Sequence, residues 1–154
     1  MLLLRVTLSG SGLLVLPNNN FIKTIIMLEP RRITSNIKPK TFVNLWNGKW
    51  YYNYDIQSEV VTVPSMEEGG EPTEETRYSY IQVKMAGKPD YKRCVEYVIR
   101  EHITQSQEFD LINSCNRAAF NMLSDEEADK AGTDYLEYLN KVSEIKAKVK
   151  SDFE

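Results

Sequence analysis

Alternating, aromatic-rich positions dominate the middle of the chain. Two such runs, Thr41–Trp46 and Lys49–Ile56, flank the dipeptide Asn47-Gly48. This pattern predicts a β-hairpin, because Asn-Gly supplies the positive φ angles that a type I′ turn requires. The period of two puts the second run's alternate residues on opposite faces, with Trp50, Tyr52, Tyr54 and Ile56 on one and Tyr51, Asn53 and Asp55 on the other.

The same strand pattern continues or restarts over Glu59–Val63 and returns over Arg77–Met85. Between them, residues 64–76 hold two Pro, two Gly and five Glu, so a mobile acidic loop is expected there. An antiparallel meander of about three strands follows from these runs.

The C-terminal part of the chain has apolar residues at a spacing of 3.6, which predicts two or three helices. Pro89 suits a first helical position. Capping-box spacing at Thr104/Gln107 and at Ser124/Glu127 marks two further starts. Gly132 is expected to break the chain, with Thr133 or Asp134 capping the last helix. The fold class is therefore α+β, with a small antiparallel sheet followed by packed helices.

The predicted organisation has three parts. Residues 41–154 form a single α+β domain, and residues 27–40, with Pro30 and Pro39, form an extended basic arm. Residues 1–26 are an atypical apolar leader with no run long enough for a membrane span. Two interpretations of the leader stay open: a short hairpin of 2–8 with 13–16, or a true translation start at Met27.

Composition narrows the class of protein. The chain has 154 residues and a mass of 17.8 kDa, and it is 42% hydrophobic and 27% charged, which excludes general disorder. Two cysteines are too few for a disulfide-rich scaffold or a Cys-rich zinc module. Reduced thiols at Cys94 and Cys115 fit an intracellular compartment.

Charge is distributed unevenly along the chain. Residues 1–50 carry seven Lys or Arg and one acid, net +6, whereas residues 51–154 carry 12 basic and 21 acidic residues, net −9. The arm is expected to contact an acidic neighbour such as a second copy of the chain, and nucleic acid or lipid headgroups are the alternative. The acidic body disfavours nucleic acid. Candidate arm contacts are Arg31, Arg32, Lys38 and Lys40.

The sequence offers little for catalysis. It contains no phosphate loop, GxGxxG, GxSxG, HExxH or CxxC motif. The only histidine, His102, is two helical turns from Cys94 and is expected to be structural. Asp55 is the single acid in an aromatic strand and hence the best catalytic candidate, although a solvent-facing position is the simpler interpretation. A non-enzyme without cofactor or metal is predicted.

Clustered aromatic residues are the most distinctive feature. Three interpretations are open: cross-strand packing, a protein interface, and a stacking platform for a sugar or another small ligand. The candidate interaction surface consists of Trp46, Trp50, Tyr52, Tyr54, Tyr78 and Tyr80.

Four segments carry a resemblance to known proteins: NGKWYYNYDI, RYSYIQVKMAGKPDYKRCVEYVIREHI, SQEFDLINSCNRA and YLEYLNKVSEIKAKVKSDF. They resemble small proteins encoded in phage and prophage regions of gut Bacteroidales, and their order is similar to that of some phage tail-module proteins. The resemblance implies a non-enzymatic structural or assembly protein that contacts phage proteins or itself, in the host cytoplasm or the virion. The alternative is a carbohydrate- or small-ligand-binding module that uses the aromatic sheet face.

Overall fold

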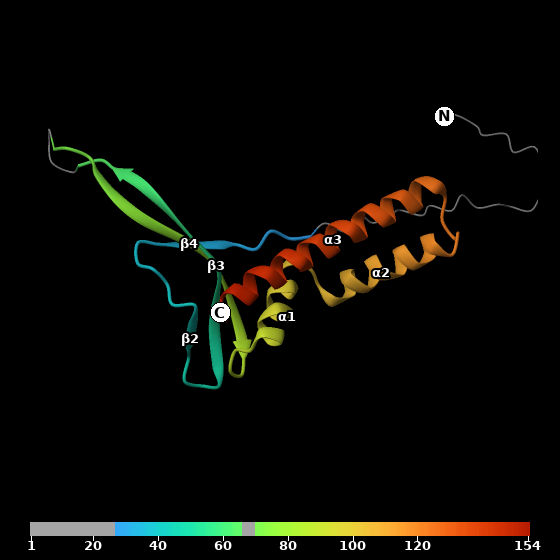
Figure 1. Cartoon of the computed structure of the whole chain (residues 1–154), viewed down its shortest axis with the longest axis horizontal. Coiled ribbons are helices and arrows are strands. Elements are labelled where there is room, and N and C mark those ends of the chain that lie inside the picture. The colour runs from blue at the N-terminus through green and yellow to red at the C-terminus, as the bar shows by residue number, and fades with distance from the viewer. Residues whose placement is uncertain (1–26, 66–69) are drawn as a thin grey trace, which may run out of the picture.

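The computed structural model describes residues 27–65 and 70–154. The leader, with both of its interpretations, and residues 66–69 lie outside the described residues. Four strands precede three helices (Figure 1): β1 (Arg32–Ser35), β2 (Phe42–Asn44), β3 (Lys49–Val63), β4 (Thr73–Ala86), α1 (Tyr91–His102), α2 (Gln105–Ala119) and α3 (Asp125–Ser151).

The strands form one antiparallel sheet in the order β1-β4-β3-β2. This confirms the predicted α+β class and adds a fourth strand to the expected meander. The extra strand is β1, which pairs Arg32 with Ile81 and Ser35 with Tyr78. The basic arm is thus not separate from the domain, because its centre supplies one edge of the sheet.

The β2–β3 hairpin forms as predicted, but the prediction of a type I′ turn is wrong. The Leu45 N–H donates to the Lys49 carbonyl at 2.9 Å, around a longer loop. Positive φ falls on Trp46 (67°) and Gly48 (72°) and not on Asn47. Side chains explain the difference, because the carboxamide oxygens of Asn44 and Asn47 accept from the N–H groups of Trp46 and Lys49 and so hold a looser loop.

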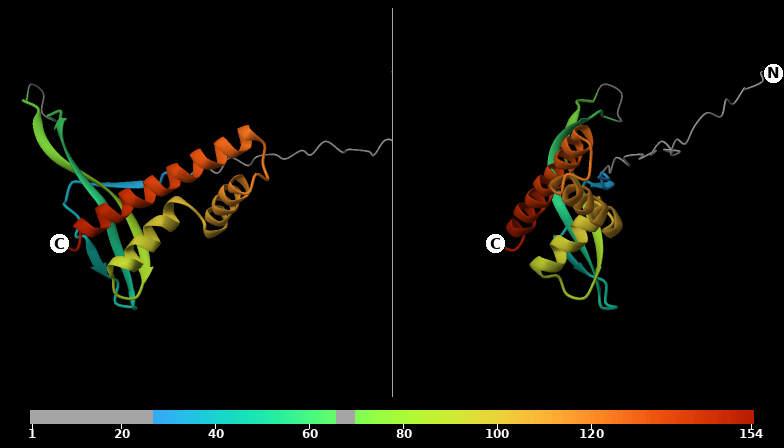
Figure 2. Two further views of the ribbon diagram at one scale, coloured as in Figure 1. Left: turned by 45° about the vertical axis from the view of Figure 1, so that its right-hand side comes forward. Right: turned by 90° about the vertical axis from the view of Figure 1, so that its right-hand side faces the viewer.

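Strand β3 continues through Glu59–Val63, one of the two predicted possibilities, and β4 is longer than predicted. Residues 73–76, expected in the acidic loop, extend β4 and pair with Val60–Val63. Beyond the other two strands, Glu59–Val63 and Thr73–Arg77 continue as a twisted two-stranded extension that projects away from the helices (Figures 1 and 2). We call this part the ribbon.

A β-bulge interrupts β3 between Tyr54 and Gln57. Asp55 lies in it with φ 53°. Bulges re-aim side chains and end strict alternation. The simple period of two, which placed Asp55 with Tyr51 and Asn53, therefore fails at this position.

The helix starts follow the capping signals. Thr104 and Ser124 both form capping boxes, whereas α1 starts after Asp90, which accepts from the Arg93 N–H, and not at Pro89. The predicted break at Gly132 is wrong, because α3 runs unbroken through it. A helical glycine costs only about 1 kcal/mol, and the packing of Ala131, Tyr138 and Ile145 on either side outweighs that cost.

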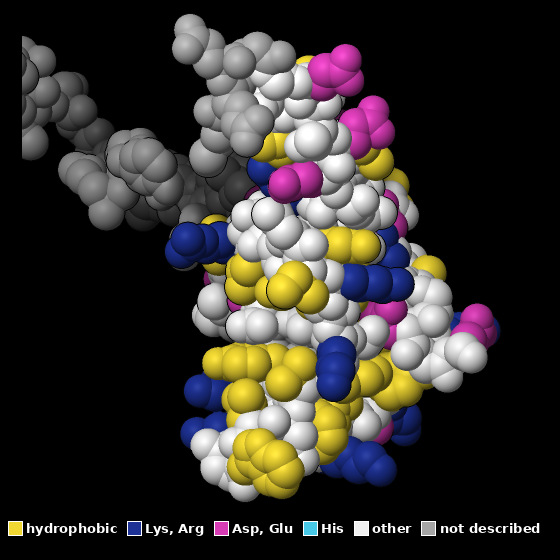
Figure 3. All heavy atoms as spheres, turned by 90° about the vertical axis from the view of Figure 1, so that its left-hand side faces the viewer, with side chains coloured by type: hydrophobic (Ala, Val, Ile, Leu, Met, Phe, Trp, Pro, Cys, Tyr) yellow, Lys and Arg dark blue, Asp and Glu magenta, His cyan; other side chains and the backbone are white. Residues whose placement is uncertain are grey.

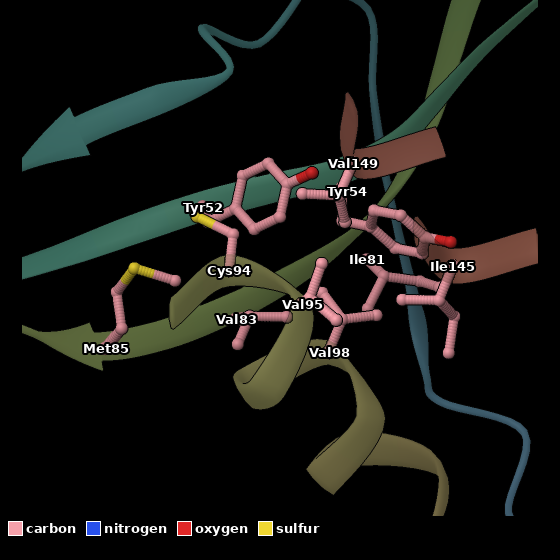
Figure 4. Close-up of a cluster of buried hydrophobic side chains, with 10 residues drawn as sticks. All are labelled: Tyr52, Tyr54, Ile81, Val83, Met85, Cys94, Val95, Val98, Ile145 and Val149. Atoms are coloured by element: carbon pink, nitrogen blue, oxygen red, sulfur yellow. The ribbon is translucent and has the colours of Figure 1, made fainter. Parts of the chain in front are cut away.

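Helices α1 and α3 cover one face of the sheet, as the side views show (Figure 2). The core between them joins aromatic and aliphatic side chains from β3, β4, α1 and α3 (Figure 4): Tyr52, Tyr54, Ile81, Val83, Met85, Cys94, Val95, Val98, Ile145 and Val149. A smaller cluster of Ile103, Leu111 and Tyr138 joins the three helices. The opposite face of the sheet has no covering helix among the described elements.

Candidate interaction surface

The uncovered sheet face carries every second residue of the strands. Because Tyr52, Ile81 and Val83 face the helices, their neighbours point the other way. Val43 lies opposite Tyr51, Tyr51 opposite Lys84, and Ile33 opposite Tyr80. Figure 3 shows this side of the molecule, with hydrophobic side chains gathered over its lower half, Lys and Arg around them, and Asp and Glu mainly toward the ribbon above.

The β1–β2 connection crosses this face. Asn53 lies beneath it and is only 3% exposed, and its side-chain N–H donates to the Lys40 carbonyl at 2.7 Å. Its carboxamide oxygen accepts from Gln82 at 3.0 Å. A buried amide with both groups satisfied fixes the path of the connection, because losing either partner would leave a desolvated polar atom.

Trp46 is the most exposed large hydrophobic residue described, at 93%. It lies in the β2–β3 loop, in the left-handed region that bulky residues rarely adopt. Three exposed lysines lie near this loop. Lys49 is the first residue of β3, and Lys88 follows Gly87, whose N–H donates to the Gly48 carbonyl. Lys84 lies on β4, with its ammonium 6.0 Å from the centre of the Tyr51 ring. We call Trp46, Lys49, Lys84 and Lys88 the Trp46 end.

The ribbon at the other end of the sheet is acidic. Over residues 59–63 and 73–77 it holds three acidic residues, Glu59, Glu74 and Glu75, and one basic residue, Arg77. Glu71 lies just before its second strand. Where the ribbon passes the β1–β2 connection, the surface has an open hollow of about 500 Å³, lined by Asn36, Ile37, Lys38, Glu75, Thr76 and Tyr78. Ile37 is 80% exposed beside it. The lining is mixed: Ile37 and Tyr78 are apolar or aromatic, Asn36 and Thr76 are polar, and Lys38 and Glu75 give one charge of each sign.

The structure corrects part of the predicted aromatic surface. Tyr52 and Tyr54, at 0% and 3% exposure, are core residues and not surface residues. Trp50 is half-buried on the same face and packs against that core. Helices α1 and α3 cover this face because its alternate positions on β4 are aliphatic. Trp46, Tyr78 and Tyr80 remain outside the core, the two tyrosines half-buried on the uncovered face.

The basic arm is also corrected at one position. Arg32 donates to the Asp55 carboxylate and to the Asp55 and Ser79 carbonyls, each within 2.9 Å, so its guanidinium is used inside the sheet. Arg31, Lys38 and Lys40 are exposed, and Lys38 lines the hollow. The sequence could not separate these cations, because only strand pairing brings Arg32 to Asp55.

Asp55, the candidate catalytic acid, is held by ion pairs. Besides Arg32 at 2.7 Å, its carboxylate accepts from Lys148 of α3 at 2.9 Å. Partial burial raises its pKa, but the hydrogen bonds from Lys148, Arg32 and Gln57 outweigh burial and hold the pKa below its usual value. A carboxylate with these partners joins β1, β3 and α3, which is a structural role.

Cys94 and His102 lie in the packed interior. Burial, followed by the charge of Asp90, raises the pKa of Cys94 to about 12, so the thiol stays protonated. His102 Nδ1 donates to the Leu28 carbonyl at 3.0 Å, and the Leu28 N–H donates to the His102 carbonyl at 2.8 Å. This reciprocal pair ties the start of the described chain to the end of α1.

Within residues 27–65 and 70–154, no cluster of three or more His, Cys, Asp or Glu side chains could hold a metal ion. No helix in the same residues has the length and apolar character needed to cross a membrane.

Sequence reasoning missed Ile37, Tyr51 and Lys84 as surface residues. The alternation along the strands could have predicted Tyr51 and Lys84, because both point to the face opposite the core. Ile37 and the hollow were not, since they depend on where the β1–β2 connection crosses the sheet. Comparison of the chain with protein families, with curated proteins and with solved structures gives no significant match.

Proposed function

We propose that this chain is a non-enzymatic phage or prophage structural or assembly protein that acts through protein–protein contacts at its β2–β3 loop and uncovered sheet face. The observation that carries the proposal is Trp46, an aromatic side chain left 93% exposed on a hydrogen-bonded loop. Tryptophan is among the residues most enriched at the energetic centres of protein interfaces.

The rest of the uncovered face supports the same function. The uncovered face offers half-buried Tyr51, Tyr78 and Tyr80, and tyrosine is enriched at protein interfaces. The groups with catalytic potential are already engaged: Asp55 in ion pairs, His102 with the Leu28 backbone and Cys94 in the core. The phage setting rests on the sequence resemblance alone.

The carbohydrate-binding alternative loses the platform on which it depended. Trp50, Tyr52 and Tyr54 lie together, but toward α1 and α3, and the rings of Tyr52 and Tyr54 are inaccessible to a sugar.

Site-specific photo-crosslinking tests the proposal. A photoreactive phenylalanine analogue replaces Trp46, and in a control chain it replaces Phe120, which is 75% exposed at the end of α2. Both chains are expressed in the bacterium that carries the gene, and the prophage is induced. We expect adducts with a capsid, portal or tail protein, or with the chain itself, from position 46 and not from position 120. Equal yields from both positions, or no adduct from position 46, would overturn the proposal.

A further inference from the structure

We propose that copies of this chain associate head to tail, with Trp46 of one copy seated in the hollow beside the acidic ribbon of the next. The inference rests on the proposed function and names a second copy as the partner. It joins two features that the structure leaves unexplained separately: an exposed tryptophan at one end of the sheet and an open hollow at the other.

The size and chemistry of the hollow support the contact. The hollow is open and about 500 Å³, and within its mixed lining Ile37 and Tyr78 supply the apolar and aromatic atoms that an indole ring can contact. The Trp46 indole N–H needs an acceptor when it is buried, and the Glu75 carboxylate lines the hollow. The Lys38 ammonium lies in the same lining and suits the face of an indole ring.

Charge complementarity supports a second copy as the partner. Lys49, Lys84 and Lys88 lie on or next to the strand ends that bound the Trp46 loop, whereas Glu74 and Glu75 belong to the ribbon and Glu75 lines the hollow. Figure 3 shows acidic side chains mainly toward the ribbon. The next acidic residue along the chain from Lys88 is Asp90, and its carboxylate already caps α1 and pairs with Arg93. Docking one end on the other therefore brings opposite charges together, whereas contact between like ends brings like charges together.

The two ends cannot meet within one copy. Lys49, beside the Trp46 loop, and Val60, opposite Thr76 at the hollow, lie on the same strand. At a rise of about 3.3 Å per residue they are about 35 Å apart. Pairing of β3 with β4 along this whole length prevents the strand from folding back. The complementary surfaces are satisfied only by another molecule.

The contact is heterologous, because it joins different patches of the two copies. Such a contact leaves one Trp46 and one hollow free at the ends of every open chain of molecules. Assembly therefore continues beyond a dimer until a ring closes or a filament grows. This property separates the proposal from a symmetric dimer, in which each copy would use the same patch.

Two variants test the contact by sedimentation velocity on the full chain. Trp46→Ala removes the inserted side chain and keeps the hollow. Thr76→Arg fills the hollow, adds a charge that repels the Trp46 end, and keeps Trp46. Phe120→Ala is the matched control, an exposed aromatic far along the chain from both features. Circular dichroism and thermal unfolding establish that each variant is folded.

The wild-type chain and Phe120→Ala should form species larger than dimers as concentration rises. Raising NaCl from about 0.05 M to about 0.5 M should shift them toward monomer, because salt screens exposed charges. For each variant alone, the self-association constant should fall at least tenfold, as expected when an interface hot spot is lost. A one-to-one mixture of Trp46→Ala and Thr76→Arg should form a dimer and stop there, since only one intact contact is possible.

Three results would overturn the head-to-tail contact: a wild-type chain that is monomeric at every concentration, a Thr76→Arg variant that dimerises by itself, or a mixture that stays monomeric. The crosslinking experiment separates this failure from that of the proposed function. Adducts between position 46 and a different phage protein, together with a monomeric wild-type chain, would reject self-association and leave the assembly function standing.

Discussion

Asp55 and Lys148 are 93 residues apart in the chain and form an ion pair, with Asp55 Oδ1 accepting from Lys148 Nζ at 2.9 Å. The bulge in β3 makes this contact possible, because it turns Asp55 from the uncovered face toward α3. Arg32 of β1 holds the other carboxylate oxygen at 2.7 Å. One side chain thus connects the edge strand, the central strand and the long helix.

Replacing Asp55 with Asn should lower the free energy of unfolding by about 2 kcal/mol, because two charge-assisted hydrogen bonds are lost. Asn tolerates the positive φ of Asp55, so backbone strain does not contribute. Urea unfolding of Asp55→Asn, Lys148→Met and the double variant gives the coupling energy of the pair. Lys150→Met is the control, because its pair with Glu154 is exposed. Additive effects of the two changes would contradict the connecting role.

The same carboxylate should make stability depend on acid pH. The pKa of Asp55 is lower in the folded than in the unfolded chain. The contribution of Asp55 to the free energy of unfolding is therefore complete above its pKa in the unfolded chain, about 3.8, and is lost as pH falls through its pKa in the folded chain. Unfolding curves at several acid pH values should show a smaller loss for Asp55→Asn than for the wild-type chain.

Tyr52→Phe should destabilise the fold by about 1–2 kcal/mol at neutral pH. The Tyr52 hydroxyl donates to Asp152 Oδ2 at 2.6 Å and ties the end of α3 to the sheet. Burial raises the pKa of Asp152, and the bond from Tyr52 opposes that shift, so its loss raises the pKa further. Tyr54→Phe is the matched control, because the Tyr54 hydroxyl has no hydrogen-bond partner in the described part of the chain. Equal losses for the two variants would remove the assigned role of the Tyr52 bond.

Acidification below about pH 6.5 should destabilise the protein through His102. Burial, followed by the charge of Lys141, lowers the pKa of His102, with Lys148 acting in the same direction and the Leu28 carbonyl and Glu29 opposing. Folding thus favours the neutral imidazole. The contribution of His102 to the free energy of unfolding is complete above the pKa of the unfolded chain and is lost as pH falls toward the pKa of the folded chain. His102 is the only histidine in the chain, so NMR titration of one imidazole gives the folded pKa directly. A folded pKa above 6.5 would contradict this prediction.

Gly132→Ala should stabilise the protein by about 0.5–1 kcal/mol, because alanine favours the helix and an added Cβ meets open space. Gly87→Ala should do the opposite, because Gly87 has φ 76° and its added Cβ would lie 2.5 Å from the Arg93 guanidinium. Thermal unfolding of both variants measures the difference. A loss of stability in Gly132→Ala would indicate that the glycine is needed where the helix passes its neighbours.

The sequence by itself determined the elements that depend on nearby residues. Capping boxes at Thr104 and Ser124, the β2–β3 hairpin and the inward positions on β4 are all set within a few residues of the chain. Such signals are local because a cap needs only a side chain three residues from its partner, and a strand face needs only alternation.

The tertiary structure decided what depends on distant partners. Arg32 joined the sheet because β4 offered an unpaired edge, and the bulge at Asp55 is stabilised by Arg32 and Lys148 together. Helix α3 continued through Gly132 because packing on both sides outweighed the local propensity. The candidate surface followed from the same cause. The choice of which aromatic face the helices covered fixed Tyr52 in the core, and the crossing of the β1–β2 connection created the hollow opposite the Trp46 end.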